Sequence, residues 1–128
     1  MAKEKLCVMV VDDEDAVRSA LAENLVECGF EVIEARDGQE AIRLIAEGCR
    51  PLVMVTDIIM PRKEGLETIV EVRRHHPGIR LVAISGGGRS KSADFLQLAQ
   101  KLGADAVMPK PVDIDELEKT VRRLAVEG

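Results

Sequence analysis

The stretch LCVMVVDDED (residues 6–15) places a run of apolar residues directly before four consecutive acidic ones. The apolar part, residues 6–11, is nearly continuous in Val, Leu and Met, which is typical of a strand that is covered on both faces, as in a parallel sheet. Neighbouring carboxylates repel one another, and ionised groups beside a protein core are costly. The acidic residues therefore either extend into water or surround a positively charged group.

Four further apolar runs predict strands, at residues 30–35, 52–56, 80–84 and, more weakly, 106–108. A segment whose apolar residues recur with the period of a helix follows each of the five strands. Strands that alternate with helices through short connections form a parallel sheet wrapped on both faces, so we expect an α/β fold with a doubly wound, five-stranded parallel sheet. Such sheets bind ligands beyond the carboxyl ends of their strands.

Two of the expected helices begin with a capping box, in which an acceptor side chain is followed three residues later by Glu. These boxes are Asp37 with Glu40, and Asp113 with Glu116. Residues 64–76 are expected to form a third helix. The core-facing residues are expected to be Val17, Leu21, Leu25 and Cys28 in the first helix, Ala41, Leu44 and Ile45 in the second, Phe95, Leu98, Ala99 and Leu102 in the fourth, and Ile114, Leu117, Val121 and Leu124 in the fifth.

Composition narrows the classes of function. The chain has 128 residues, which indicates one domain over residues 1–128. Its net charge of −5 argues against nucleic-acid binding, which normally uses a basic face, and against binding to anionic membranes. No apolar stretch is long enough to span a bilayer. Cys7, Cys28 and Cys49 are odd in number and lack metal-binding spacing, which indicates reduced thiols and a cytoplasmic protein.

Polar residues with complementary chemistry follow four of the predicted strands. Asp12 and Asp13 follow the first strand, Asp57 the third, Ser85 the fourth and Lys110 the fifth. Mg²⁺ prefers hard oxygen ligands such as carboxylates, and lysine is a point charge suited to a phosphate oxygen. The sequence therefore predicts a magnesium and phosphoryl site at this edge of the sheet, where a cation and the lysine offset the repulsion between neighbouring acids.

Taken singly, each of these residues also has a simpler explanation. Acidic residues at a helix start are favoured by the helix dipole, and Asp57 fits a helix N-cap. Ser85 fits a turn residue before three glycines, and Lys110 fits a surface lysine. Only their combination on neighbouring strand ends favours the site. Glu14 and Asp15 are expected to point into water at the start of the first helix.

The site residues belong to a longer pattern. Its parts are Val11-Asp12-Asp13, DIIMP (residues 57–61) with Gly65 after it, Ile84-Ser85, and Lys110-Pro111. This pattern covers nearly the whole chain in order and resembles that of two-component response-regulator receiver domains of the single-domain, chemotaxis-regulator type. The resemblance implies a flavodoxin-like (βα)5 fold with strand order 2-1-3-4-5.

The resemblance also implies roles for the acidic residues. Asp57 would be the phosphoacceptor, receiving a phosphoryl group from the phosphohistidine of a sensor histidine kinase or a histidine phosphotransfer protein. The implied cofactor is Mg²⁺. Asp13 and Asp57 would bind the ion directly, Asp12 would bind it through a water molecule, and the backbone carbonyl of Ile59 would be a further ligand.

Ser85 and Lys110 would bind the phosphoryl oxygens, and the peptide bond between Lys110 and Pro111 would be cis. The family often has Tyr or Phe at the position of Val107, where the ring reports phosphorylation by turning inward. Valine cannot report in that way, so we expect the loop at residues 86–91 and the fourth helix to carry more of the response.

The resemblance implies that the domain signals by binding another protein or by passing the phosphoryl group to a phosphotransfer protein. It would act either as a regulator that ends after its fifth helix or as a domain of a larger regulator. The family's common surface for downstream proteins is formed by the fourth helix, the fifth strand and the fifth helix. Residues expected on or near it are Arg89, Lys91, Gln97, Gln100, Lys101 and Lys119. They do not identify the downstream protein.

Two other functions fit part of the pattern. A phosphohydrolase of the haloacid-dehalogenase type also uses an aspartyl nucleophile, but it carries a D-x-D-x-T pattern, whereas Ile58 and Ile59 follow Asp57. A flavin-binding module has the same fold, but flavin rings usually stack on aromatic residues, and this chain has only Phe30 and Phe95. We therefore expect a phosphorylation-activated switch rather than an enzyme that turns over a separate substrate.

Overall fold

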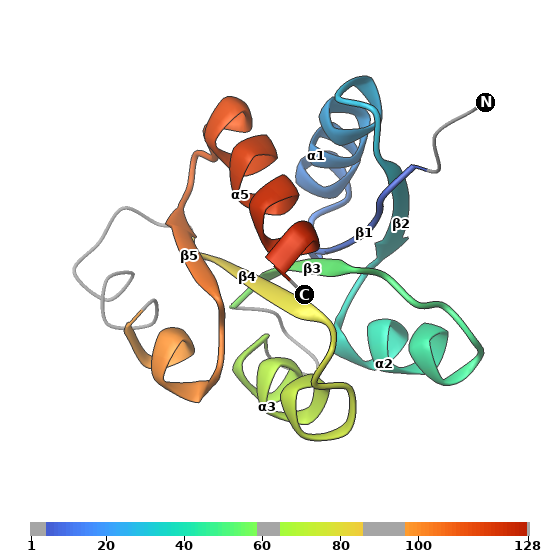
Figure 1. Ribbon diagram of the computed structural model, residues 1–128, viewed down its shortest axis with the longest axis vertical. Coiled ribbons are helices and arrows are strands. Elements are labelled where there is room, and N and C mark those ends of the chain that lie inside the picture. Colours follow the sequence, from blue (N-terminus) through green and yellow to red (C-terminus); the bar gives the residue numbers. More distant parts are fainter. Residues whose placement is uncertain (1–4, 59–64, 86–96, 128) are drawn as a thin grey trace.

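A five-stranded parallel sheet forms the centre of the molecule in the computed structural model, which describes residues 5–58, 65–85 and 97–127 (Figure 1). The strand order is β2-β1-β3-β4-β5, which confirms the predicted order 2-1-3-4-5. The strands are β1 (Cys7–Val11), β2 (Glu31–Ala35), β3 (Val53–Asp57), β4 (Arg80–Ser85) and β5 (Ala106–Pro109).

Helices cover both faces of the sheet. α1 (Asp15–Glu27) and α5 (Ile114–Glu127) lie on one face, and α2 (Gly38–Ala46) and α3 (Gly65–His75) lie on the other (Figure 1). Residues 97–102 are also helical and lie on the side of α3. This doubly wound arrangement is the flavodoxin-like fold that the alternating pattern predicts.

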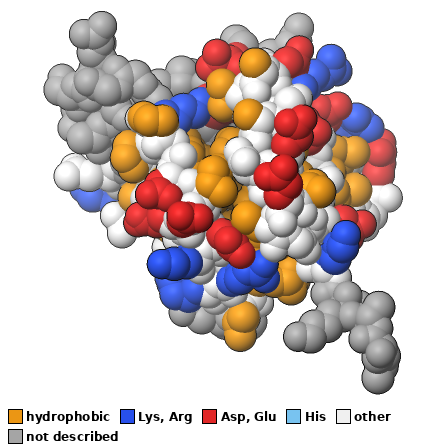
Figure 2. Space-filling view, turned by 90° about the horizontal axis from the view of Figure 1, so that it is seen from above, with side chains coloured by type: hydrophobic (Ala, Val, Ile, Leu, Met, Phe, Trp, Pro, Cys, Tyr) orange, Lys and Arg blue, Asp and Glu red, His pale blue; other side chains and the backbone are white. Residues whose placement is uncertain are grey.

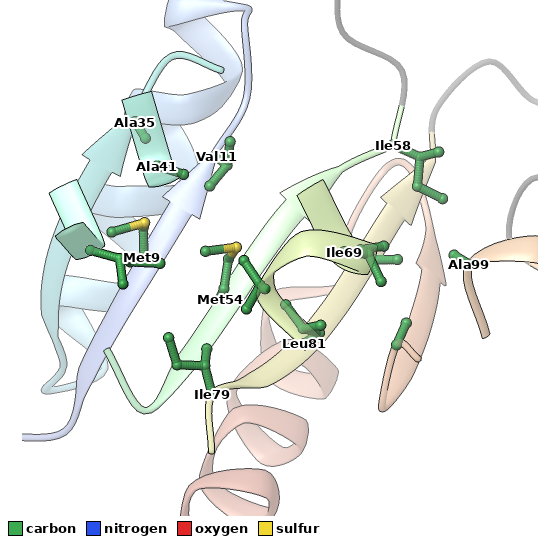
Figure 3. Close-up of a cluster of buried hydrophobic side chains, with 14 residues drawn as sticks. Met9, Val11, Ala35, Ala41, Met54, Ile58, Ile69, Ile79, Leu81 and Ala99 are labelled. Atoms are coloured by element: carbon green, nitrogen blue, oxygen red, sulfur yellow. The ribbon is translucent and has the colours of Figure 1, made fainter. Parts of the chain in front are cut away.

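The alternation of side chains along β1 creates two cores. Successive side chains of a strand point to opposite faces of a sheet. Met9 and Val11 therefore pack with residues of α2 and α3 (Figure 3), whereas Val8 and Val10 pack with residues of α1 and α5. All four side chains are buried. A strand covered on both sides is apolar at every position, which explains the continuous run in the sequence.

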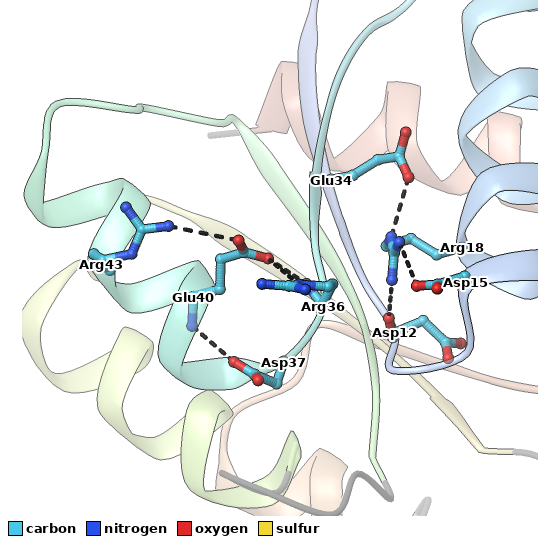
Figure 4. Close-up of polar contacts among 8 residues, drawn as sticks. All are labelled: Asp12, Asp15, Arg18, Glu34, Arg36, Asp37, Glu40 and Arg43. Atoms are coloured by element: carbon cyan, nitrogen blue, oxygen red, sulfur yellow. Dashed lines mark hydrogen bonds and ion pairs between the residues drawn. The ribbon is translucent and has the colours of Figure 1, made fainter.

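Capping side chains begin two helices where the sequence predicts them. The carboxylate of Asp37 accepts a hydrogen bond from the backbone N–H of Glu40 at 2.8 Å (Figure 4). Asp113 accepts one from the N–H of Glu116 at 3.2 Å. The side chain of Glu40 accepts from the N–H of Arg36 at 2.6 Å, so this capping interaction extends one residue beyond the standard box.

One of the predicted core-facing stripes needs correction. In the fourth helix, Leu98 is 42% exposed, so its assignment to the core was wrong, whereas Ala99 is buried; Phe95 lies outside the described residues. In the first helix, the predicted residues do face the core: Leu21 and Leu25 are buried, and half-buried Val17 and Cys28 pack against them. Arg18 is also buried, which the apolar period did not predict. The apolar period alone therefore located the helices but not every residue that they bury.

The three cysteines are half-buried free thiols. Burial raises the pKa of Cys7 and of Cys28, so little of either is present as the reactive thiolate at neutral pH.

Among the described helices, none combines the length and the apolar character that crossing a bilayer requires. On the side where α1 and α5 lie, acidic, basic and apolar side chains are interspersed (Figure 2).

Candidate phosphoryl and magnesium site

The carboxyl ends of β1, β3, β4 and β5 bring the predicted site residues to one edge of the sheet. Asp57 is the last residue of β3 and is paired with Ile84, which precedes Ser85 at the end of β4. Asp12 directly follows β1, and Lys110 directly follows β5. Residues separated by as many as 98 positions in the sequence therefore become neighbours.

Three aspartates form the acidic cluster, which we define as Asp12, Asp13 and Asp57. Each offers a carboxylate oxygen, and these oxygens lie within 4.8 Å of one another. Asp12 is 2% exposed and Asp57 is 7% exposed, while Asp13 faces solvent. Carboxylates this close and this buried repel one another unless a positive charge lies between them.

The donor set of the acidic cluster fits Mg²⁺. All three side chains offer hard oxygen atoms, and exposed Asp13 leaves the site open to water, several molecules of which Mg²⁺ usually retains. Two oxygens on opposite sides of the ion, each about 2.1 Å from it, are about 4.2 Å apart, so the cluster needs only small adjustments to bind it.

Lys110 supplies a positive charge beside the cluster. Its Nζ lies 3.0 Å from Oδ2 of Asp12 and 3.3 Å from Oδ2 of Asp57. Burial lowers the pKa of Lys110, but the hydrogen bond to Asp12, the charges of Asp57 and Asp12 and the hydrogen bond to Asp57 outweigh it, so the net pKa lies above the ordinary value. The backbone N–H of Lys110 donates to the carbonyl of Ser85 at 2.9 Å, and its peptide bond to Pro111 is cis.

Comparison with known proteins identifies the family. The sequence model of the family described as response regulator receiver domain matches residues 8–122 of this chain. The chain belongs to the response-regulator receiver family. The match covers all five strands except the first residue of β1, and most of α5.

Relatives of this receiver domain include a sensor kinase and several regulators. It is 34% identical over 118 residues to the sensor kinase CckA of Brucella abortus, covering 91% of this chain and 12% of that protein. It is 37% identical over 113 residues to the transcriptional regulatory protein PdtaR of Mycobacterium tuberculosis, covering 86% of this chain and 52% of PdtaR. A response regulator receiver domain from Clostridium thermocellum superposes with a TM-score of 0.87 at 27% identity, covering 95% of both chains. The chain thus spans about half or less of the relatives it matches by sequence.

Gly65, part of the receiver pattern, lets α3 begin directly against the end of β3, which carries Asp57. A Cβ atom at this position would lie 2.1 Å from the carbonyl oxygen of Asp57 and 2.5 Å from Cα of Ile58. The backbone N–H of Gly65 donates to the carbonyl of Ile58 at 2.8 Å, and the backbone N–H of Ile58 donates to the carbonyl of Ile84 at 2.9 Å. The glycine is therefore required by close approach of two backbones, and these bonds fix the end of β3.

Arg18 contacts the segment that carries Asp12, and the sequence pattern does not predict this contact. Its guanidinium donates to the backbone carbonyl of Asp12 at 2.9 Å, to Asp15 at 2.7 Å and to Glu34 at 3.1 Å (Figure 4). Asp15 was expected only to point into water; it is exposed but also pairs with Arg18. The carboxylate of Asp12 also accepts a hydrogen bond from the N–H of Glu14 at 2.9 Å.

A groove of about 910 Å³ opens beside the acidic cluster and Lys110. Asp13, Asp57 and Lys110 line its polar end, and α1 and the segment after β5 line its apolar walls. The wall residues are Ala16, Val17, Ala20, Leu21, Pro111, Val112 and Ile114. Asp57 is therefore reached from a concave surface with room for a bound group.

The predicted switch elements are only partly within the described residues. Val107 in β5 is half-buried and packs against the core on the side of α2 and α3. Ser85 is buried at the end of β4. Ile59 and the loop at residues 86–91 lie outside the described residues. Of the predicted surface for downstream proteins, Arg89 and Lys91 also lie outside them, whereas Gln97, Gln100, Lys101 and Lys119 are exposed.

Proposed function

We propose that this receiver domain, extending over residues 1–128, accepts a phosphoryl group on Asp57 from the phosphohistidine of a sensor histidine kinase or a histidine phosphotransfer protein. The observation that carries the proposal is the position of Lys110, whose Nζ bridges Asp12 and Asp57 at 3.0 and 3.3 Å beside the acidic cluster. A buried carboxylate with a lysine and two further acids around it has the components for binding a transferred phosphoryl group.

The chemistry requires little covalent participation by the other residues. A carboxylate oxygen of Asp57 attacks phosphorus, the bond between phosphorus and the donor imidazole nitrogen breaks, and that nitrogen leaves with the electron pair. Catalysis of such a transfer depends on positioning and on stabilisation of the charge on the phosphoryl oxygens. We assign Lys110 and Ser85 to bind these oxygens, and the lysine would then exchange its contact with Asp57 for one with the phosphoryl group.

Magnesium is part of the proposal. We assign Asp13 and Asp57 as direct ligands, Asp12 as a ligand through water and the backbone carbonyl of Ile59 as a further ligand. When bound, Mg²⁺ neutralises negative charge on the carboxylates and the phosphoryl oxygens. The fit rests on the donor set of the acidic cluster and on the 4.8 Å limit between its oxygens.

The proposed output is a change in binding to another protein, or transfer of the phosphoryl group to a phosphotransfer protein. The surface proposed for the downstream protein combines the helical residues 97–102, β5 and α5, where Lys101 and Lys119 are exposed. The product is an acyl phosphate, which is hydrolysed by water. The phosphorylated state, and with it the signal, therefore ends by this hydrolysis. We therefore propose a switch rather than an enzyme that releases a product at each turnover.

Phosphorylation by a small donor tests the proposal. The purified chain is incubated with acetyl phosphate and Mg²⁺, and its intact mass is measured; Asp57→Asn is the test variant, and Asp37→Asn, at the N-cap of α2 and outside the site, is the matched control. We expect one added phosphoryl group in the wild type and in Asp37→Asn, and none in Asp57→Asn or after chelation of the metal. Equal phosphorylation of Asp57→Asn would refute the assignment.

A further inference from the structure

Arg18 is the one buried arginine or lysine among the residues that the structure describes. Its side chain is 11% exposed. Burying a guanidinium is costly unless its N–H groups have acceptors with good geometry. Arg18 has three such acceptors, on the segment after β1, in the first turn of α1 and in β2. Such a residue fixes the relative positions of three segments.

The most buried of these contacts reaches the acidic cluster. Nη1 of Arg18 donates to the backbone carbonyl of Asp12 at 2.9 Å. That carbonyl belongs to the peptide group that joins Asp12 to Asp13, two of the three members of the cluster. Because a peptide group is planar, holding its oxygen fixes the orientation of the whole unit. The contact therefore constrains where both carboxylates project.

The contacts of Arg18 indicate that it acts through geometry rather than through charge. Asp15 and Glu34 lie 2.7 and 3.1 Å from the guanidinium, so two carboxylates already offset its positive charge. A guanidinium has a rigid, planar set of five donors and can bind three acceptors in fixed directions, whereas a lysine ammonium cannot reproduce this fork.

We infer that Arg18 is a positioning residue for the acidic cluster: it holds the peptide between Asp12 and Asp13 in the orientation that Mg²⁺ binding requires, without contacting the ion. The inference rests on the proposed function, because it takes the acidic cluster as the magnesium site. Loss of a residue that orients metal ligands typically weakens metal binding by about tenfold or more.

The direction in which substitution of Arg18 changes the Mg²⁺ affinity distinguishes a positioning role from an electrostatic one. If Arg18 acted mainly by its charge, Arg18→Met would remove a positive group near the site and strengthen Mg²⁺ binding, and Arg18→Lys would leave it unchanged. Positioning predicts that Arg18→Met weakens binding about tenfold. It also predicts that Arg18→Lys weakens binding, because the single ammonium cannot make all three contacts.

Arg73→Met is the matched control. Arg73 also links separate segments, donating to the carbonyl of Gly103 at 2.8 and 3.2 Å and pairing with Asp105 at 2.7 Å. These contacts lie beside the amino ends of β4 and β5, at the opposite edge of the sheet from the acidic cluster. Its loss is expected to destabilise the fold without changing Mg²⁺ affinity.

The experiment is a Mg²⁺ titration of the unphosphorylated chain, followed through backbone amide NMR shifts, which also report whether each variant is folded. Weaker binding in Arg18→Met and Arg18→Lys, with Arg73→Met equal to the wild type, supports the inference. Unchanged or tighter binding in Arg18→Met overturns it, as does equal weakening in Arg73→Met. If Arg18→Met does not fold, Arg18→Lys decides: wild-type affinity in that variant overturns the inference. Failure of the wild type itself to bind Mg²⁺ refutes the proposed metal site and the inference with it.

Discussion

Replacing Gly65 by alanine tests whether the start of α3 positions Asp57, the proposed phosphoacceptor. The added Cβ would lie 2.1 Å from the carbonyl oxygen of Asp57 and 2.5 Å from Cα of Ile58. Favourable contacts between such atoms lie at about 3.5–4.0 Å. Either α3 or the end of β3 must therefore move by more than about 1 Å. The obstructing atoms belong to the backbone, so no side-chain rotation relieves the clash.

The expected loss of stability follows from two opposing terms. Overpacking of this kind typically costs about 1–3 kcal/mol, and the rigid backbone places this site at the upper end. Alanine is a better helix former than glycine by about 1 kcal/mol in a helix interior, and this gain is smaller at the first position of α3. We expect a net loss of about 2–3 kcal/mol in the free energy of unfolding. Displacement of Asp57 by about 1 Å is expected to slow phosphorylation about 100-fold.

Gly78→Ala provides the matched control, because a Cβ at Gly78 would meet nothing within 4 Å. This variant is expected to have wild-type stability or to gain about 0.4–1 kcal/mol from a less flexible unfolded chain. Stability is measured by urea unfolding followed by far-UV circular dichroism, since the chain lacks Trp and Tyr, and the rate of phosphorylation by acetyl phosphate is measured by intact mass. A Gly65→Ala variant with the stability and rate of Gly78→Ala would refute the close-approach argument.

Three further predictions use the same measurements. Asp105→Ala removes the acceptor of the Leu81 N–H at 2.8 Å and the partner of Arg73 at 2.7 Å, so urea unfolding should show a loss of about 2 kcal/mol; an unchanged midpoint would contradict this. Asp37→Ala removes the N-cap of α2 and should cost about 1 kcal/mol in the same assay. The folded-state pKa of Lys110 is raised, so its stabilising contribution is complete below about pH 10 and is lost as the pH rises through the folded-state value. The wild type should therefore lose more stability above about pH 10 than Lys110→Met, and equal losses would argue against the ion pairs.

The strand ends were predictable from the sequence because they depend on short-range patterns. A run that is apolar at every position, as in residues 7–11, indicates a strand covered on both faces, and the residue after it must emerge at the sheet edge. The parallel order then brings Asp12, Asp57 and Lys110 together without any further information. Capping was also predictable, because Asp37 and the N–H that it binds are three residues apart.

Contacts that depend on tertiary packing were not predictable. Arginine is mostly exposed in folded proteins, so the sequence does not mark Arg18 as buried. Only the fold brings Glu34 and the Asp12 carbonyl to it. Leu98 fits the apolar period of its helix, yet that period does not show how much of the helix is covered. The close approach at Gly65 is likewise invisible in sequence, because it depends on the path of the neighbouring backbone.

The central claim is that the fold gathers three carboxylates and a lysine at one edge so that Asp57, and neither of its acidic neighbours, carries the phosphoryl group. The most direct measurement is to phosphorylate the chain with acetyl phosphate and Mg²⁺, reduce the acyl phosphate with borohydride, and locate the resulting homoserine by peptide mass spectrometry. We predict homoserine at position 57 and at neither position 12 nor position 13. Homoserine at position 12 or 13, with position 57 unmodified, would contradict the account.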